Sequence, residues 1–405
     1  MVITAFWGAS LVSINLGVAQ LTIYRILLII NLIVGIRYYA KKKKILNKYL
    51  IYIELWIIYS LITVLLAEDK YAWIRSNFFL ITGYLAVIVI ASYYDSQDKL
   101  IKLNRYLSFF GKIYVLAGFY ENIAGKYLFA VDNYFNQALD IYHLRPPIFV
   151  AGNPNNYSLT VLIFIYIFII ENSYAQNRVK RVLNLVIIAI SIYLIIISGS
   201  RAVIIAGLIS SFIFESFGIR NKIFVWSAFA FVLLLSIRAL FHFGILEFNA
   251  DIFGSDMVRL NLIRNGFVFL KRTLFIGVGS GNAEYWVSHY AKYYTGGITN
   301  LHNWWMEILV TNGIISLTLY IIFLVKIIEG LISNVENKIV LKSYISSIIG
   351  FMIGSITVSS NMQTEWQWVY YAILIATIRA KPQKYSDGST FFENVGRVEK
   401  RDIGV

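Results

Sequence analysis

The chain has 405 residues, of which 58% are hydrophobic and only 14% charged, and its mean hydropathy is +0.66. Since soluble domains carry about one-quarter charged residues, this composition excludes a water-soluble fold and predicts an all-α bundle of membrane-spanning helices. The absence of cysteine excludes disulfides, thiolate nucleophiles and Cys-type zinc sites. The formal net charge of +14 does not indicate a nucleic-acid partner, because the basic residues are interleaved with apolar runs.

About twelve apolar runs have the character of transmembrane helices, each needing roughly 20 apolar residues to cross. They are predicted at residues 2–13, 21–38, 50–66, 73–92, 106–120, 157–170, 182–197, 202–217, 223–241, 304–325, 339–358 and 366–378. The first run lacks the features of a cleaved signal peptide, so we expect a short first helix. Together they make one polytopic domain, residues 1–380, followed by a flexible cytoplasmic tail, 381–405.

Lys and Arg accumulate in cytoplasmic loops, which sets the expected orientation. Most of the 36 basic residues fall between alternate runs, near residues 37–48, 99–105, 178–181, 220–222 and 326–342, and after 379. Both termini are therefore predicted to be cytoplasmic. Two long segments, 121–149 and 242–301, are predicted on the other face, where loops of such length are usually functional. Arg145, in the first of them, is a candidate for substrate binding.

Arg201 lies between two apolar runs, in the sequence SGSR at 198–201. One helix through both runs would be roughly 50 Å long, so the chain is expected to turn back here. A charged residue at such a place normally faces the bundle or a water-filled cavity. Ser200 adds a hydroxyl, which makes the turn a small anion-receptive corner; the alternative is that Arg201 extends to the lipid headgroups.

Residues 257–272 have helical periodicity and are predicted to form an amphipathic helix on the outer membrane surface. Arg259 falls on the apolar face and is expected to point toward the bundle, whereas Arg264 points away. Arg259 is therefore the better candidate for a buried anion, unless the helix begins later and Arg259 only flanks it. Arg264 stays a candidate for substrate binding.

His302 and Asn303 open the run at 304–325. A lone histidine is more often structural than catalytic, but His302 lies at the start of a helix on the predicted outer side, and Asn303 is a candidate for substrate binding. Glu307, one turn on, is expected to orient His302 or Asn303, to pair with an arginine, or to be structural. Asn153 precedes another run, where a binding role competes with a turn and helix cap. No metal-ligand motif appears outside the cytoplasm, so neither a metal nor another cofactor is expected.

Four segments, in this order, resemble the O-antigen ligase and Wzy-type polysaccharide polymerase superfamily, including its teichuronic acid polymerase-like members. They are GNPNN at 152–156, SGSRA at 198–202, VRLNLIRNGFVFLKRTLFIGVGSGN at 258–282 and LHNWWMEILVTNGII at 301–315. The resemblance implies a GT-C-like, metal-independent, inverting glycosyltransferase in a bacterial plasma membrane. It would use an undecaprenyl-diphosphate-linked glycan at the outer leaflet, with Arg201 and Arg259 holding the pyrophosphate and His302 assisting the acceptor hydroxyl.

The resemblance leaves the reaction open between two close alternatives. The first choice is a polymerase of repeat units for a capsule, exopolysaccharide or O-antigen, and the second is a ligase that moves finished glycan to a terminal acceptor. A solute transporter and a lipid-binding scaffold are more distant alternatives. The expected partners are the lipid-linked glycan, membrane lipid, and the flippase and chain-length regulator of the same pathway, with no nucleic acid.

Overall fold

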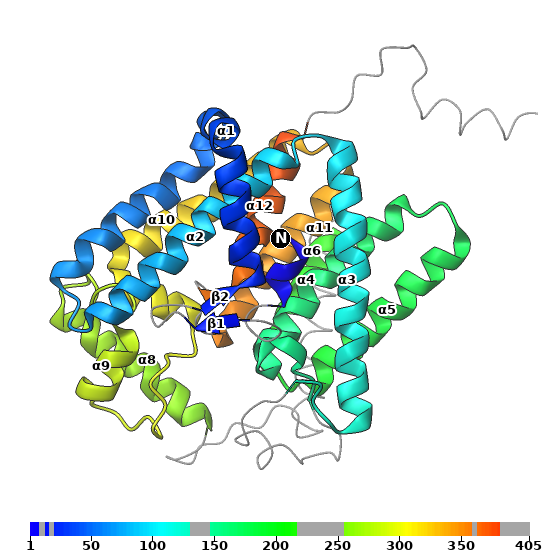
Figure 1. Ribbon diagram of the computed structural model, residues 1–405. Helices are drawn as coiled ribbons and strands as arrows, with labels where there is room; N and C mark the ends of the chain where they lie inside the picture. Colours follow the sequence, from blue (N-terminus) through cyan, green and yellow to red (C-terminus); the bar gives the residue numbers. More distant parts are fainter. Residues whose placement is uncertain (8–12, 16–19, 130–145, 217–254, 359–362, 381–405) are drawn as a thin grey trace, which may run out of the picture.

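The computed structural model describes residues 1–7, 13–15, 20–129, 146–216, 255–358 and 363–380, and these form a helical bundle with one short hairpin (Figure 1). The all-α class is confirmed. The helices are α1 (Ile23–Ile62), α2 (Lys70–Tyr93), α3 (Gln97–Ala124), α4 (Pro154–Tyr174), α5 (Arg178–Ile197), α6 (Arg201–Ser216), α8 (Ser255–Arg272), α9 (Ala283–Tyr290), α10 (Trp304–Asn334), α11 (Lys338–Gly354) and α12 (Glu365–Arg379).

Six segments of the described chain are long and apolar enough to cross a membrane. They are Lys48–Leu65, Lys70–Tyr93, Pro154–Tyr174, Arg178–Ile197, Trp304–Asn334 and Lys338–Thr357. A shorter apolar helical segment, Ile23–Gly35, precedes them. The predicted run 223–241 lies outside the described residues, and the full set of about twelve spans stays a prediction.

The predicted first helix at residues 2–13 is wrong. Ile3–Phe6 form a 3-10 helix, and Ser13–Asn15 (β1) pair antiparallel with Gln20–Thr22 (β2). The Phe6 ring packs inside the bundle, 5.0 Å between centroids from Phe164. A stretch this short is marginal as a helix and cannot span a bilayer, so tertiary burial of Phe6 and the hairpin determine its structure.

The runs predicted at 21–38 and 50–66 belong to one helix, α1, rather than to two separated by a loop. Four contacts with α2 define its path: Arg25 with Phe79, Tyr38 with Ser92, Glu54 with Tyr84, and Ser60 with Trp73. The first half of α1 is therefore parallel to α2 and the second half antiparallel. The helix turns back near its lysine run, at the top of Figure 1, so two arms replace the two predicted spans.

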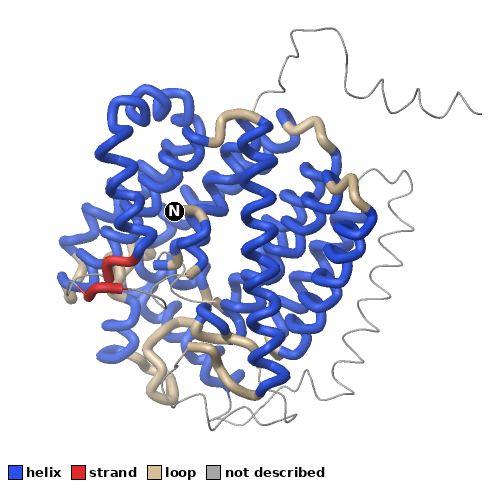
Figure 2. The backbone as a smooth tube through the Cα atoms, turned by 45° about the vertical axis from the view of Figure 1, so that its right-hand side comes forward, coloured by secondary structure: helices blue, strands red, loops and turns tan. Residues whose placement is uncertain are grey.

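Helices α4 and α12 form the centre of the bundle. Every residue of α12 from Glu365 to Ile378 is buried, and the helix packs on α2 and α10. Helix α4 lies among α3, α5 and α11, while α6 packs along α11. The turn between α5 and α6 falls at 198–200, as predicted. Figure 2 shows the hairpin at the edge of these mainly upright helices.

The two ends of the bundle are formed by different elements. At one end the turn of α1, the end of α2, the start of α3 and the end of α12 lie together, where Arg379 Nη1 donates to the Ala91 carbonyl at 2.7 Å and Lys99 pairs with Asp95. We call this the basic end. The opposite end carries the hairpin, the α5–α6 turn, α8, α9 and the start of α10 (Figure 1). The predicted site residues that the structure describes lie at this opposite end.

Candidate functional site

Two arginines from different helices share one carboxylate. Arg201, the first residue of α6, places Nη2 2.5 Å from Asp256 Oδ1, and Arg259 places Nη1 4.0 Å from the same oxygen. The arginine side chains are 30% and 41% exposed, whereas that of Asp256 is 13% exposed. Among the described residues, two positive charges meet one negative charge at this partly exposed position, which favours binding of an anion.

The pKa of Arg259 is affected by the neighbouring charges of Asp256 and Arg201. Burial lowers the pKa of the Arg259 guanidinium, Asp256 raises it and the neighbouring charge of Arg201 lowers it again. An arginine nevertheless keeps its proton at neutral pH. The two guanidinium groups therefore repel each other, and a bound dianion would relieve that repulsion.

His302 lies close enough to Arg259 to be affected by its charge. Burial and the positive charge of Arg259 both lower the pKa of the His302 imidazole from its usual value of 6.5. The ring is neutral at pH 7, the form that accepts a proton. The backbone of His302 has φ +47°, a left-handed conformation that costs energy for a non-glycine residue, and its N–H donates to Asn300 Oδ1 at 2.9 Å. The structure thus brings Arg201 and Arg259 to one carboxylate, and His302 lies within the electrostatic influence of Arg259.

The other predicted binding residues differ in where they lie relative to the arginine pair. Ser200 directly precedes Arg201, is 3% exposed, and has a hydroxyl oxygen with no hydrogen-bond partner in the described structure. Arg264 is exposed on α8 and lies against Asn261 and Tyr293, away from the Asp256 carboxylate. Arg145 lies outside the described residues.

Two predicted binding asparagines cap helices. Asn153 Oδ1 accepts from the Asn156 N–H at 2.8 Å at the start of α4. Asn303 Oδ1 accepts from the Met306 N–H at 3.0 Å at the start of α10. Each cap satisfies a backbone donor that the first helical turn leaves unpaired. The cap at Asn303 also fixes where α10 begins, and hence the place of His302.

The glycine-rich segment after α8 enters the bundle at a break in α10. Gly313 interrupts that helix with φ 71° and ψ −176°. Three backbone hydrogen bonds cross between the segments: Val278 N–H to Val310 O, Gly279 N–H to Thr311 O, and Ile314 N–H to Phe275 O. A Cβ at Gly279 would lie 2.7 Å from Ala67 Cα, and one at Gly313 would lie 2.1 Å from Ile276 O. These glycines therefore permit close backbone approach.

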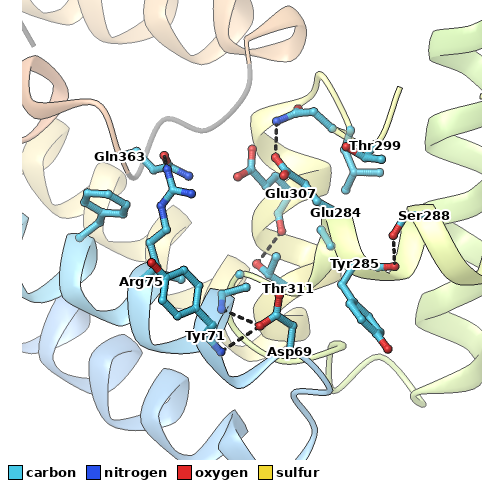
Figure 3. Close-up of a pocket in the computed structure, with 17 residues that line it drawn as sticks. Asp69, Tyr71, Arg75, Glu284, Tyr285, Ser288, Thr299, Glu307, Thr311 and Gln363 are labelled. Carbon is cyan, nitrogen blue, oxygen red and sulfur yellow. Dashed lines mark hydrogen bonds between the residues drawn. The ribbon is translucent and has the colours of Figure 1, made fainter. Parts of the chain in front are cut away.

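A cavity of about 390 Å³ adjoins this break (Figure 3). The start of α2, helix α9 and the first turns of α10 surround it, and its charged lining residues are Asp69, Arg75, Glu284 and Glu307. Two further lining residues, Asn300 and Leu301, directly precede His302. Among the described residues, no group of three or more His, Asp or Glu side chains is arranged to hold a metal ion.

The sequence predicts that Glu307 lies near His302, but it does not predict the role of Asp256 or the cavity. The spacing of Asp256 and Arg259, three residues apart on a predicted helix, was a signal for their pairing. The cavity had no comparable signal, because it forms only when α2 meets α9 and α10. Ser76 Oγ lies 2.8 Å from Ser280 Oγ at that contact.

Two comparisons with known proteins give the family that the chain resembles. The family model described as O-Antigen ligase matches residues 186–321, a range that includes Arg201, Arg259 and His302. The chain is also 25% identical, over 411 residues, to the teichuronic acid biosynthesis protein TuaE of Bacillus subtilis (strain 168). That alignment covers 93% of this chain and 83% of the relative. The matches agree with the resemblance seen in the sequence: the chain is similar to proteins of the O-antigen ligase and Wzy-type polymerase family.

Proposed function

We propose that the chain polymerises undecaprenyl-diphosphate-linked oligosaccharide repeat units into a surface polysaccharide. The observation that carries this proposal is the meeting of Arg201 and Arg259 at Asp256, with His302 beside Arg259. Two arginine side chains at one place provide the positive charge needed to bind the diphosphate of a lipid-linked glycan. The polysaccharide would be a capsule, an exopolysaccharide or an O-antigen.

The chemistry follows from the side chains. Guanidinium groups bind phosphate oxygens with paired hydrogen bonds and keep their charge, so two arginines do the electrostatic work of a divalent cation. The acceptor hydroxyl oxygen attacks the anomeric carbon from the side opposite the diphosphate. The bond from that carbon to the phosphate oxygen breaks and its electron pair leaves with undecaprenyl diphosphate. His302 takes the hydroxyl proton, and the anomeric configuration inverts.

The charge distribution supports an outer-leaflet site. Basic residues resist translocation, so we assign the basic end to the cytoplasm, together with both termini. The arginine pair then faces the opposite side of a bacterial plasma membrane. A flippase delivers lipid-linked repeat units to that side, and a chain-length regulator limits the product.

The proposal is tested by reconstitution of the full chain with lipid-linked repeat units in the presence of EDTA. We expect chain growth in the wild type and none in Arg201→Ala, Arg259→Ala or His302→Ala. If EDTA alone stops growth, the metal-independent mechanism is wrong. If all three variants extend the glycan at the wild-type rate, the assigned residues are wrong.

A ligase is the second candidate, because the matching family model carries that description. Both reactions use the same donor and differ in the acceptor. A deletion strain separates them: glycan of single repeat length accumulates when a polymerase is missing, whereas long lipid-linked polymer accumulates when a ligase is missing.

A further inference from the structure

The cavity beside α9 and the arginine cluster are different places. His302 does not itself line the cavity, but it directly follows two lining residues, Asn300 and Leu301. Arg201 and Arg259 do not line the cavity. Asn300 does line the cavity, and its side-chain oxygen accepts a hydrogen bond from the His302 N–H. The positive charge of Arg259 lowers the pKa of the His302 imidazole. The His302 backbone is therefore held at the edge of this partly open cavity, while its imidazole is under the electrostatic influence of Arg259. A glycosyl transfer needs the sugar donor and the sugar acceptor to be held on either side of a general base.

The cavity has the polarity that a sugar needs. Its lining includes Glu284, whose Oε1 accepts from Asn300 Nδ2 at 3.1 Å, and Glu307 in the first turn of α10. A carboxylate has about four acceptor positions, so Glu284 can take sugar hydroxyls besides Asn300. In Figure 3 both carboxylates come from the α9 and α10 side and face Arg75 across the space.

Aromatic side chains add apolar faces to the same space. Phe79 and Tyr71 of α2 line one wall, and Tyr285 of α9 lines another. Rings of this kind pack against the C–H faces of a sugar, while the polar groups bind its edges. The volume of about 390 Å³ lies within the range of about 300–1,000 Å³ usual for small-molecule sites.

The charge of the lining discriminates among sugars. Among the described residues that line the cavity, three carboxylates, those of Asp69, Glu284 and Glu307, stand against one cation, Arg75, which donates to Gln363 Oε1 at 3.3 Å. Asp69 Oδ1 is occupied by the Tyr71 and Ala72 N–H groups, but its charge remains. A sugar carboxylate placed here meets like charges, which costs affinity. Hydroxyl and acetamido groups meet acceptors instead.

We infer that this cavity is the acceptor site and that it takes an uncharged or acetamido-bearing sugar rather than a uronic acid. The inference rests on the proposed function, because it assigns the acceptor of that same reaction. The terminal sugar of the acceptor enters between α2 and α9 and presents one hydroxyl to His302. Glu284 and Glu307 hold neighbouring hydroxyls.

The test measures binding directly, on the full chain in lipid nanodiscs, by saturation-transfer NMR. The probes are methyl glucoside, methyl N-acetylglucosaminide and methyl glucuronide. We expect the two uncharged probes to bind about tenfold or more tighter than the glucuronide. In Glu284→Gln and Glu307→Gln the preference against the glucuronide shrinks. Glu329→Gln, at an exposed pair with Lys326, is the matched control and leaves all three affinities unchanged.

The outcomes separate this inference from the proposed function. Equal affinity for the glucuronide and the glucoside, or wild-type preference in both cavity variants, overturns the inference even if the wild type extends glycans. Arg201→Lys is expected to bind the glycosides normally while losing chain growth. Glycoside binding by a wild-type protein that extends no lipid-linked glycan overturns the polymerase proposal and leaves the sugar site in place.

Discussion

Arg201 Nη2 lies 2.5 Å from Asp256 Oδ1, and this ion pair joins the first residue of α6 to the first turn of α8. The two helices are far apart in sequence, and the pair sets the direction of one guanidinium group and restrains the helix that carries Arg259. Asp256 touches no reacting atom in the proposed reaction. Its expected role is to position the arginines.

Asp256→Asn removes the charge that draws the two arginines together, so chain growth is expected to fall by about 10- to 100-fold. Asp256→Glu, which keeps the charge, recovers part of the rate. The melting temperature, measured alongside, separates a positioning effect from unfolding. A rate equal to that of the wild type in Asp256→Asn would mean that the carboxylate only screens the arginines.

Arg201→Lys and Arg259→Lys keep the charge but lose the planar fork that binds two phosphate oxygens. Each is expected to lower the rate of chain growth by about 100- to 1,000-fold, as the loss of one positioned donor does in other enzymes. Binding of undecaprenyl diphosphate is measured in parallel. Arg264→Lys is the matched control, because Arg264 lies on the exposed side of the same helix. A similar loss in that control would argue against a specific cluster.

The pH dependence of chain growth should report His302. Burial and the charge of Arg259 lower the pKa of His302 below 6.5, and the neutral ring is the base. The rate is therefore expected to be constant above pH 6.5 and to fall as acidification protonates the ring. His302→Gln should lower the rate by about 100- to 10,000-fold and abolish this acidic limb. An unchanged limb in His302→Gln would place the base elsewhere.

The apolar runs predicted most helices because burial in a membrane bundle follows local sequence. Helices α2, α4, α5 and α11 all overlap their predicted runs. The sequence also singled out three site candidates. Arg201 was chosen because a charge between two apolar runs is costly, Arg259 because it falls on the apolar face of an amphipathic helix, and His302 because it begins a helix. Where these three residues lie relative to one another depends on where α8 packs, which no single segment specifies.

Long-range contacts explain what the sequence did not predict. The first segment is shaped by the contact of Phe6 with Phe110 and Phe164, not by its own helix propensity. The cavity depends on Asn282, whose Oδ1 accepts the Asp69 N–H at 2.7 Å across more than two hundred residues. Neither contact has a periodic signature.

Gly313→Ala tests the break in α10. A Cβ at this position would lie 2.1 Å from the Ile276 carbonyl oxygen, and φ of 71° is unfavourable for alanine. We expect a large loss of folded protein, measured as the monodisperse fraction after purification and as the melting temperature. Gly207→Ala is the matched control, since its nearest neighbour, Leu162 Cδ1, is 3.7 Å away within an ordinary helix. It should be neutral or slightly stabilising.

Arg25 and Glu365 form a buried ion pair: their side chains are 7% and 5% exposed, and the Arg25 Nε and Glu365 Oε1 atoms are 3.1 Å apart. The same carboxylate oxygen accepts from Thr22 Oγ1 at 2.6 Å, so the pair fastens the hairpin and α1 to the central helix α12. Glu365→Gln leaves a buried guanidinium without its counter-charge, and such losses cost about 3–5 kcal/mol.

The measurement is the free energy of unfolding in mild detergent. Glu329→Gln, at the exposed pair with Lys326, is expected to change it by less than about 1 kcal/mol. The double variant Arg25→Met with Glu365→Gln should recover much of the loss, because both buried charges are then gone. If the double variant is no more stable than Glu365→Gln, the destabilisation comes from the shape of the site rather than from the uncompensated charge of Arg25.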